Sequence, residues 1–371
     1  MHRSSLIFLP ALFFPISLLA APDAVKVDVV QNRLDHPGRW RSCRTIKAAG
    51  DLKGGQIKAL AGRKRAFRPD RRRTQGLGKR PGRVAGRGTR PGFEKSRRVW
   101  LSYAEAGNDG KAGTAVGYGR LSDDLSRIEG FQVVFRQMPK LSTGNHFGGR
   151  LVFDGKGYLF IGLGENNQRP TAQDLDKLQG KVVRLTEDGK VPADNPFVNT
   201  PGARPEIWSY GIRNPQGMAM NPWSDTLWLN EHGPRGGDEI NIPEKGKNYG
   251  WPLATHGINY SGLKIPEAQG EHVEGTEKPL FVWKVSPAVS GMAFYNSDVF
   301  PQWKNTLFVG ALKEKDVIVL SVEGNTVTEK GRILGDRDQR IRDVRVGPDG
   351  YLYVLTDETD GQLLKVSPSG S

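Results

Sequence analysis

The residues best suited to chemistry stand in polar, glycine-rich turns beside apolar stretches. His146 lies in LSTGNHFGGRL, directly before an apolar run, where an imidazole nitrogen can face a cavity. A histidine in such a place can act as a general base, which contributes roughly 10²–10⁴-fold to a proton-abstracting step. A loop histidine bonded to the backbone is the more common case, so this motif alone does not assign a base.

Residues 207–241, IWSYGIRNPQGMAMNPWSDTLWLNEHGPRGGDEIN, hold two polar turns around an apolar centre. The first turn supplies Arg213 and Asn214, a fixed positive charge beside an amide, which suits carboxylate or quinone oxygens. The second offers main-chain carbonyls at Gly233 and Pro234 with acids nearby, a composition that suits calcium. Loop-bracing arginines are equally common, and the second turn lacks the alternation of an EF-hand loop, so neither motif is specific alone.

A third group of residues suits a flat, anionic ligand. Tyr249 and Tyr260 lie in a glycine-rich loop, where aromatic rings either sandwich a planar molecule or seal the core. Lys313 lies in ALKEKD, and Arg340 and Arg342 stand two residues apart in RIRDVRVGPDG. Side chains two apart on a strand point the same way, so both guanidinium groups can converge on one anion. A solvated basic face is the alternative, but the following apolar YLYVL favours an inner strand.

Short strands are the elements that position these residues. Strands are expected at residues 99–105, 117–121 and 131–136, and residues 171–178 are the one short helix candidate. A weak repeat of strand, turn and strand begins at Gly148, Gly217, Ser290 and Arg342. The starts lie about 50–75 residues apart, the scale of a four-stranded blade with its loops. The pattern predicts an all-β propeller, with a β-sandwich of the same hairpins as the alternative.

The start of the chain resembles a cleavable secretory signal. A short positive start is followed by an apolar centre at residues 6–19 and then by small residues, so residues 1–20 are predicted to be removed. A buried N-terminal helix fits less well, because Pro10 and Pro15 interrupt it. No later stretch has the ~18 apolar residues of a membrane span. With one cysteine, Cys43, and 371 residues, the chain is expected to be an exported, soluble protein without a disulfide framework.

Residues 38–93 differ from the rest of the chain. They hold 18 Lys or Arg and two acids, a formal net charge of +16. This exceeds the +14 of the whole chain, so the excess of basic residues belongs to this segment alone. The segment lacks strand alternation, and its apolar residues are too scattered to bury a face. A nucleic-acid arm, a disordered linker and a wrong-frame translation between two compensating shifts are the competing interpretations. The abrupt change after LDHP and the recovery at FEKSRRVWLSY favour the third.

Six motifs together carry a family resemblance: NHFGGRL, EIWSYGIRNPQG, EHGPRGGDEIN, GKNYGWP, FVGALK and RIRDVRVGPDGYLYVLTD. In this order they resemble the soluble aldose sugar dehydrogenases that use pyrroloquinoline quinone (PQQ), within the glucose/sorbosone dehydrogenase family of six-bladed propellers. The match extends from residue 97 to about residue 367, and the N-terminal KVDVVQNRLDHP fits it as well. The resemblance implies a single six-bladed propeller over residues 21–371.

The resemblance also implies a role for each candidate. His146 matches the general base that takes the proton of the sugar's anomeric hydroxyl. The matches to cofactor-contacting residues are Arg213, Asn214, Tyr260, Lys313, Arg340 and Arg342. The carbonyls of Gly233 and Pro234 match ligands of the calcium ion that binds the cofactor, and Glu239 with the main-chain oxygen of Tyr249 resembles a further calcium site. A Lewis-acid metal of this kind polarises the reactive carbonyl of the cofactor.

The implied activity is that of a periplasmic PQQ- and calcium-dependent enzyme that oxidises aldoses at C1 to lactones and passes electrons to an external acceptor. A monomer or homodimer without nucleic-acid partner or membrane span is expected. The alternative is a non-catalytic, degenerate propeller that serves as a secreted binding module. The sequence departs from the family at residues 38–93, which disrupt the first blade and part of the second; the place of a cofactor-contacting glutamine falls near Pro81. Because each blade packs on two neighbours, this departure predicts poor folding and little activity.

Overall fold

The computed structural model describes residues 25–34, 84–89, 93–124 and 127–369, and these residues fold almost entirely as β-strands. Helical structure in this part is limited to α1 (Phe93–Ser96) and to three 3₁₀ turns at Arg169–Ala172, Pro301–Trp303 and Gly335–Arg337. The helix expected at residues 171–178 is wrong, since only its beginning lies in a 3₁₀ turn. Its buried residues, Ala172 and Leu178, are six positions apart and do not share a helical face.

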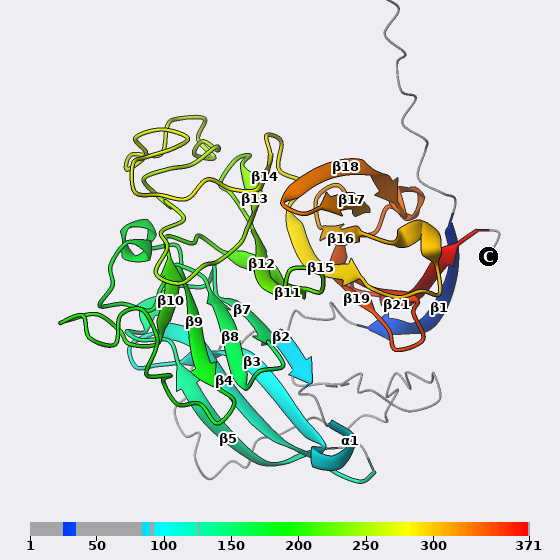
Figure 1. The fold of residues 1–371 in the computed structure, drawn as a ribbon, viewed down its shortest axis with the longest axis horizontal. Helices are drawn as coiled ribbons and strands as arrows, with labels where there is room; N and C mark the ends of the chain where they lie inside the picture. The colour runs from blue at the N-terminus through cyan, green and yellow to red at the C-terminus, as the bar shows by residue number, and fades with distance from the viewer. Residues whose placement is uncertain (1–24, 35–83, 90–92, 125–126, 370–371) are drawn as a thin grey trace, which may run out of the picture.

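The strands form five antiparallel sheets arranged around a common centre (Figure 1). The first sheet contains β2 (Val84–Thr89), β3 (Arg98–Ala106), β4 (Lys111–Leu121) and β5 (Ile128–Arg136), with β6 (Leu141–Ser142) paired to β4. The second contains β7 (Gly148–Phe153), β8 (Tyr158–Leu163), β9 (Lys181–Thr186) and β10 (Ile207–Tyr210). The third contains β11 (Pro215–Asn221), β12 (Thr226–Glu231), β13 (Asp238–Asn241) and β14 (Phe281–Trp283).

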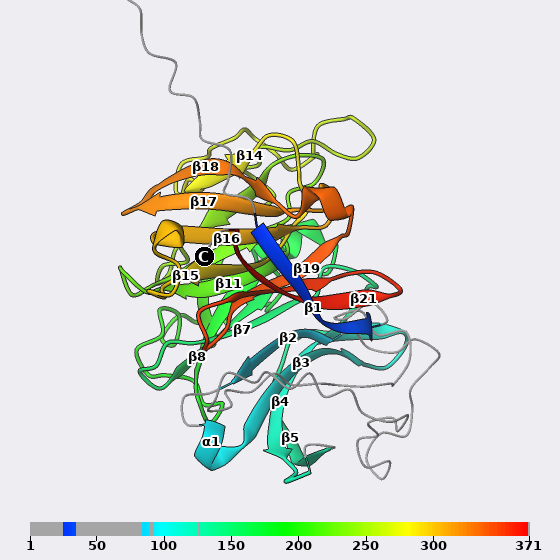
Figure 2. The same ribbon diagram turned by 90° about the vertical axis from the view of Figure 1, so that its right-hand side faces the viewer.

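The fourth sheet contains β15 (Val289–Tyr295), β16 (Thr306–Ala311), β17 (Val317–Glu323) and β18 (Thr326–Ile333). The fifth contains β19 (Ile341–Val346), β20 (Leu352–Thr356), β21 (Gly361–Pro368) and the N-terminal β1 (Val25–Leu34). β1 pairs with β21, from Val25 opposite Pro368 to Leu34 opposite Gly361, so the two ends of the described chain complete one blade (Figure 2). This pairing covers the edge of β21, and β1 becomes the outer strand of the last sheet.

The architecture is a propeller, which confirms the all-β prediction and excludes the sandwich. The predicted repeats correspond to the first two strands of four sheets, β7–β8, β11–β12, β15–β16 and β19–β20. Apolar residues of neighbouring sheets meet between the blades, as Trp228 of β12 does with Met292 of β15 and Leu307 of β16. Burial on both faces explains why these strands are continuously apolar.

The prediction of six blades is wrong for the described residues, which form five sheets. The residues between β1 and β2, numbers 35–83, lie outside the described part, as do most of the basic segment 38–93 and the predicted signal 1–20. Within the segment, the expected absence of strands is wrong at Val84–Thr89, which form β2 along β3. Strand pairing uses main-chain groups, so a stretch without side-chain alternation can still supply an innermost strand.

The propeller brings distant turns to one face. The strands β2, β7, β11, β15 and β19 each stand at the start of their sheet, and β7, β11, β15 and β19 pack in succession around the centre. His146 lies just before β7, Arg213 and Asn214 lie just before β11, and Arg340 lies just before β19. Because these strands run in the same sense, the turns before them share one end of the propeller, which forms the candidate site.

Candidate functional site

A buried carboxylate orients His146. The two oxygens of Glu165, which directly follows the β8 turn at Gly164, lie 2.8 and 3.0 Å from Nδ1 of His146. The Glu165 side chain is 0% exposed, whereas that of His146 is 18% exposed. A carboxylate that accepts the Nδ1–H proton fixes the imidazole tautomer and leaves Nε2 as the free base. The pair therefore has the arrangement of an oriented general base.

Glu165 was missed by the sequence analysis, which gave it no role in the site. It also accepts the backbone N–H of Asn167 at 2.9 Å, and its own N–H donates to the carbonyl of Arg213 at 2.9 Å. The sequence contains one signal for Glu165: it follows an apolar strand, and the loops at strand ends of a rigid β scaffold often carry functional side chains. The left-handed backbone of His146, at φ 50°, brings its carbonyl against Gly164, where a Cβ would lie 2.0 Å from that oxygen. Gly164 therefore permits the close approach of the two turns.

Arg213 is buried at the centre of the site. One of its terminal nitrogens donates to the carbonyls of His232 at 3.0 Å and Gly233 at 2.8 Å, and its guanidinium lies 5.1 Å from the ring centre of Trp251. The structure thus brings together Arg213 and Gly233, two residues singled out in the sequence. A carbonyl oxygen has two lone pairs, and Arg213 uses one of those on Gly233. The second lone pair remains available to another cation.

A buried glutamate, Glu231, and a half-buried one, Glu239, lie close together near this arginine. Glu231 accepts the backbone N–H groups of Arg213 at 2.5 Å and Asn214 at 3.2 Å. The side-chain amide of Asn241 donates to both Glu231, at 3.2 Å, and Glu239, at 3.0 Å. Burial raises the pKa of both carboxyl groups, and the charge of Glu239 raises that of Glu231 further. The site therefore concentrates negative potential that a divalent cation would neutralise.

The two tyrosines lie in different environments. Tyr249 is 6% exposed, and its hydroxyl donates to the carbonyl of Ile242 and accepts the N–H of Glu244. This side chain is therefore engaged in the core, which leaves the main-chain oxygen for the metal role that the resemblance implies. Tyr260 is 71% exposed, so its ring is accessible to a ligand at the surface of its loop.

The three predicted cations gather where the fourth and fifth sheets meet. Arg340 and Arg342 both donate to Asp357, with terminal nitrogens 3.3 and 2.6 Å from the same oxygen, so they lie together on an acid of the chain itself, and their convergence on a ligand stays a prediction. Arg340 also donates to the carbonyl of Leu312, the neighbour of Lys313. The Lys313 ammonium lies 3.2 Å from the Ser286 carbonyl and is largely exposed. Asp357, which the sequence analysis missed, organises the cluster.

Hydrogen bonds join these parts across three blade boundaries. The N–H of Glu165 donates to Arg213 O between the second and third sheets. Nε2 of His232 lies 2.6 Å from Val289 O between the third and fourth sheets. The Ser290 hydroxyl donates to Ile341 O at 2.8 Å between the fourth and fifth sheets. The base and the cations therefore belong to one connected rim of the propeller.

The residues present fit a flat polycarboxylate with a bound cation. Within the described part of the chain, Nε of Arg213, Nε of Arg342 and Oδ1 of Asn214 are buried without a hydrogen-bond partner. Buried donors of this kind normally have partners, so these two guanidinium N–H groups lack an acceptor among the described residues. The described residues contain no cluster of three His, Cys, Asp or Glu side chains able to hold a metal. A cation here would therefore depend on main-chain oxygens together with one or two carboxylates.

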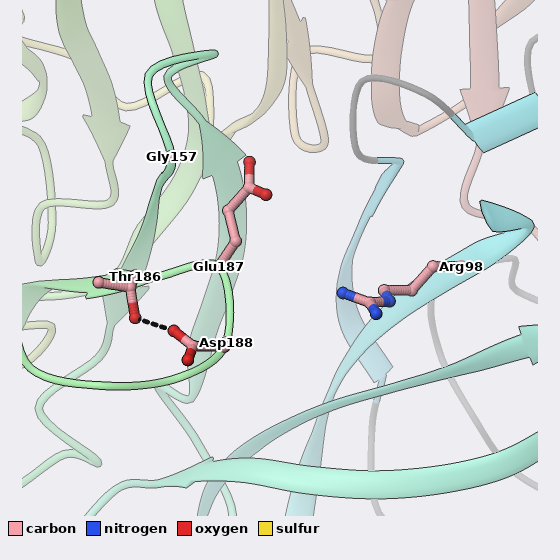
Figure 3. Close-up of a pocket in the computed structure, with 5 residues that line it drawn as sticks. All are labelled: Arg98, Gly157, Thr186, Glu187 and Asp188. Atoms are coloured by element: carbon pink, nitrogen blue, oxygen red, sulfur yellow. Dashed lines mark hydrogen bonds between the residues drawn. The ribbon is translucent and has the colours of Figure 1, made fainter. Parts of the chain in front are cut away.

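A separate cavity of about 320 Å³ lies away from this site. It is lined by Arg98, Gly157, Thr186, Glu187 and Asp188, which belong to β3, the β7–β8 turn and the end of β9. Figure 3 shows Arg98 across the space from the two acids, with Thr186 bonded to Asp188. These segments lie at the opposite end of the strands from His146, so the cavity does not belong to the candidate site.

The fold and the site define a class: a β-propeller with a carboxylate-oriented histidine and a cluster of cationic side chains on one face. The chain belongs to the glucose/sorbosone dehydrogenase family, whose model matches residues 79–365. The described part of the chain holds no apolar helix of membrane-spanning length.

The similarity to individual members ranges from part of the chain to nearly all of it. The chain is 67% identical over 371 residues to aldose sugar dehydrogenase YliI of Escherichia coli (strain K12), which covers 99% of this chain and 100% of the relative. It is 30% identical over 296 residues to quinoprotein glucose dehydrogenase B of Acinetobacter calcoaceticus, covering 60% and 61% of the two chains. The crystal structure of the soluble aldose sugar dehydrogenase from Escherichia coli in the apo-form matches with a TM-score of 0.83 over 93% of this chain and 100% of that chain, at 67% identity.

Proposed function

We propose that this protein is a PQQ- and calcium-dependent sugar dehydrogenase that oxidises aldoses at C1 to lactones. The observation that carries the proposal is the His146–Glu165 pair on the same rim as a cationic cluster with unused buried donors. The relatives named as an aldose sugar dehydrogenase and as a quinoprotein glucose dehydrogenase support it. A base alone would suit many reactions, whereas a base beside a polycarboxylate site suits an oxidation assisted by a bound quinone.

Different residues serve proton transfer and cofactor binding. Nε2 of His146 accepts the proton of the anomeric hydroxyl, and Glu165 holds the imidazole in the tautomer that leaves this nitrogen free. The bound quinone supplies the acceptor for the C1 hydride. Arg340, Arg342 and Lys313 hold carboxylates of that group, since paired guanidinium groups bind carboxylates strongly.

The calcium ion is assigned to the turn after β12. The Gly233 and Pro234 carbonyls would hold it against the cofactor, and Glu239 with the main-chain oxygen of Tyr249 would hold a second ion. Carbonyl and carboxylate oxygens are the ligands that calcium prefers. The raised pKa values of Glu231 and Glu239 support a cation nearby, because burial and like charge oppose ionisation of both groups.

We further propose that the protein acts in the periplasm as a monomer or homodimer and reduces an external electron acceptor. The signal-like residues 1–20 support export. The exposure of Tyr260 and Lys313 supports a site open to small sugars and to an acceptor.

The test uses the natural gene product, with its sequence across residues 34–98 established, loaded with PQQ and calcium. Aldose-dependent reduction of a redox dye should be observed, and nuclear magnetic resonance should identify the lactone or its aldonic acid. His146→Ala should abolish turnover while PQQ binding persists, and His272→Ala, an exposed histidine, serves as the matched control. PQQ binding without oxidation of any aldose would instead support the non-catalytic propeller.

Residues 38–93 are proposed to be a wrong-frame translation rather than a functional insertion. The abrupt change of composition after LDHP and the return to ordinary composition at FEKSRRVWLSY support this, and only the end of the segment, β2, is a described strand, which pairs with β3. Intact mass and peptide mapping across residues 34–98 of the natural product test this. Peptides that match the printed sequence would contradict the proposal, and apolar strand peptides would support it.

A further inference from the structure

One acid on the rim contacts two of the proposed cofactor-binding cations. Asp357 directly follows β20, and its side chain is 1% exposed. Its Oδ2 accepts a proton from Nη2 of Arg342 at 2.6 Å and from Nη2 of Arg340 at 3.3 Å. A single buried oxygen therefore sets the separation of the two guanidinium groups.

The backbone of the same residues is also tied together. The N–H of Asp357 donates to Arg340 O at 2.7 Å, and the N–H of Arg340 donates to Glu358 Oε1 at 2.9 Å. Arg340 reaches the next sheet by donating to Leu312 O at 3.1 Å, directly before Lys313. The position of the Arg340 side chain is thus coupled to the turn that carries the third cation.

The cluster has donors left for a ligand. Asp357 carries one negative charge against the two positive charges of Arg342 and Arg340, while Lys313 pairs with Glu314 at 3.0 Å and Glu358 accepts the N–H of Arg340. Burial by itself raises the pKa of Asp357, but the charges of Arg342 and Arg340 hold it below its ordinary value, so the acid stays ionised. Nε of Arg342 is buried without a partner in the described residues. The side chains of Arg340 and Arg342 are 39% and 21% exposed, so both guanidinium groups remain accessible to a ligand.

We propose that Asp357 is a positioning residue for the polycarboxylate cofactor, which it does not touch: it holds Arg340 and Arg342 at the spacing needed to bind a carboxylate. This inference rests on the proposed function, because it presupposes that an anionic quinone binds here. A preorganised pair of guanidinium groups binds a carboxylate better than two mobile ones, since less side-chain entropy is lost on binding.

Electrostatics and positioning predict opposite effects of an Asp357 substitution on cofactor binding. Asp357→Asn removes a negative charge beside a trianionic ligand, so simple electrostatics predicts tighter binding. Positioning predicts weaker binding, because a neutral amide oxygen accepts from the two guanidinium groups more weakly than a carboxylate oxygen and so holds them less firmly. Loss of such supporting partners typically lowers affinity roughly 10- to 100-fold.

The measurement is the dissociation constant of PQQ for the full chain with saturating calcium, by calorimetry, which does not depend on turnover. Asp357→Asn should weaken binding about 10- to 100-fold. Glu358→Gln is the matched control, because it removes the same charge from a neighbour that accepts the backbone N–H of Arg340 instead of a guanidinium proton. Its binding should stay within about threefold of the wild type.

Each result has a defined meaning. Asp357→Asn binding as tightly as the wild type or more tightly would overturn the inference, as would equal weakening by Glu358→Gln. If a thermal melt shows that Asp357→Asn is unfolded, Asp357→Glu replaces it: the charge is kept but the carboxylate is displaced, so positioning predicts weaker binding and charge counting predicts no change. Wild-type protein that binds no PQQ would overturn the proposed function, and the inference with it.

Discussion

The substitution Glu165→Gln tests the central contact of the site. Glu165 is fully buried, and its oxygens lie 2.8 and 3.0 Å from Nδ1 of His146. The change is nearly isosteric, so it removes the charge without opening a cavity. The new amide can donate a proton to Nδ1, which would favour the tautomer whose Nε2 carries a proton and cannot act as a base.

The expected loss follows from this contact. A hydrogen bond to a charged group contributes about 1.5–3 kcal/mol. Because about 1.4 kcal/mol corresponds to a tenfold change in rate, kcat should fall about 10- to 150-fold. The Michaelis constant should change little, since Glu165 contacts the histidine and not the sugar in this arrangement.

The assay is steady-state dye reduction with glucose after loading with PQQ and calcium. Circular dichroism and a thermal melt confirm that the variant is folded, and Glu323→Gln, at the exposed end of β17, is the control. An unchanged kcat in a folded, loaded variant would refute the view that Glu165 orients the base. A rise in the Michaelis constant at constant kcat would place Glu165 in substrate binding instead.

Three further outcomes follow from the packing and charge of the rim. Gly291→Ala should destabilise the fold by about 3 kcal/mol in a denaturant titration, because a Cβ there would lie 1.7 Å from Oδ1 and 2.7 Å from Cα of Asp343. Calcium at a hundredfold excess over its dissociation constant should raise stability by about 2.7 kcal/mol, and Glu239→Gln should remove part of this gain, as seen in melts with and without chelator. The folded-state pKa of Asp357 lies below its unfolded value of 3.8, so its contribution to stability is present above that pH and is lost as the pH falls below it. Asp357→Asn should therefore flatten the stability curve below about pH 4, as measured by denaturant midpoints.

Each of these outcomes has a contrasting result. Gly270→Ala, where the nearest neighbour of the added Cβ is 3.5 Å away, should be tolerated, and equal losses at both glycines would contradict the packing argument. An unchanged calcium effect in Glu239→Gln would exclude that carboxylate as a ligand. A wild-type acid slope in Asp357→Asn would show that its ion pairs do not contribute to stability.

The sequence by itself determined the repeating unit and most of the chemistry on the rim. Pairs of apolar strands that begin at Gly148, Gly217 and Ser290 could be recognised in the sequence, because much of each strand is buried between sheets and shows little polar alternation. The spacing of Arg340 and Arg342 predicted that they lie together, since alternate side chains of an extended chain point the same way.

Only the tertiary structure decided which partners these residues have. Glu165 meets His146 across 19 positions of sequence, and Asp357 meets Arg342 across 15, because antiparallel strands return the chain to the same rim. The contact between Arg340 and the Leu312 carbonyl depends on how two sheets pack, which no local pattern encodes. The number of sheets was likewise decided in three dimensions: β2 pairs through main-chain groups that every sequence has, whereas the residues before it carry no alternation from which a blade could be predicted.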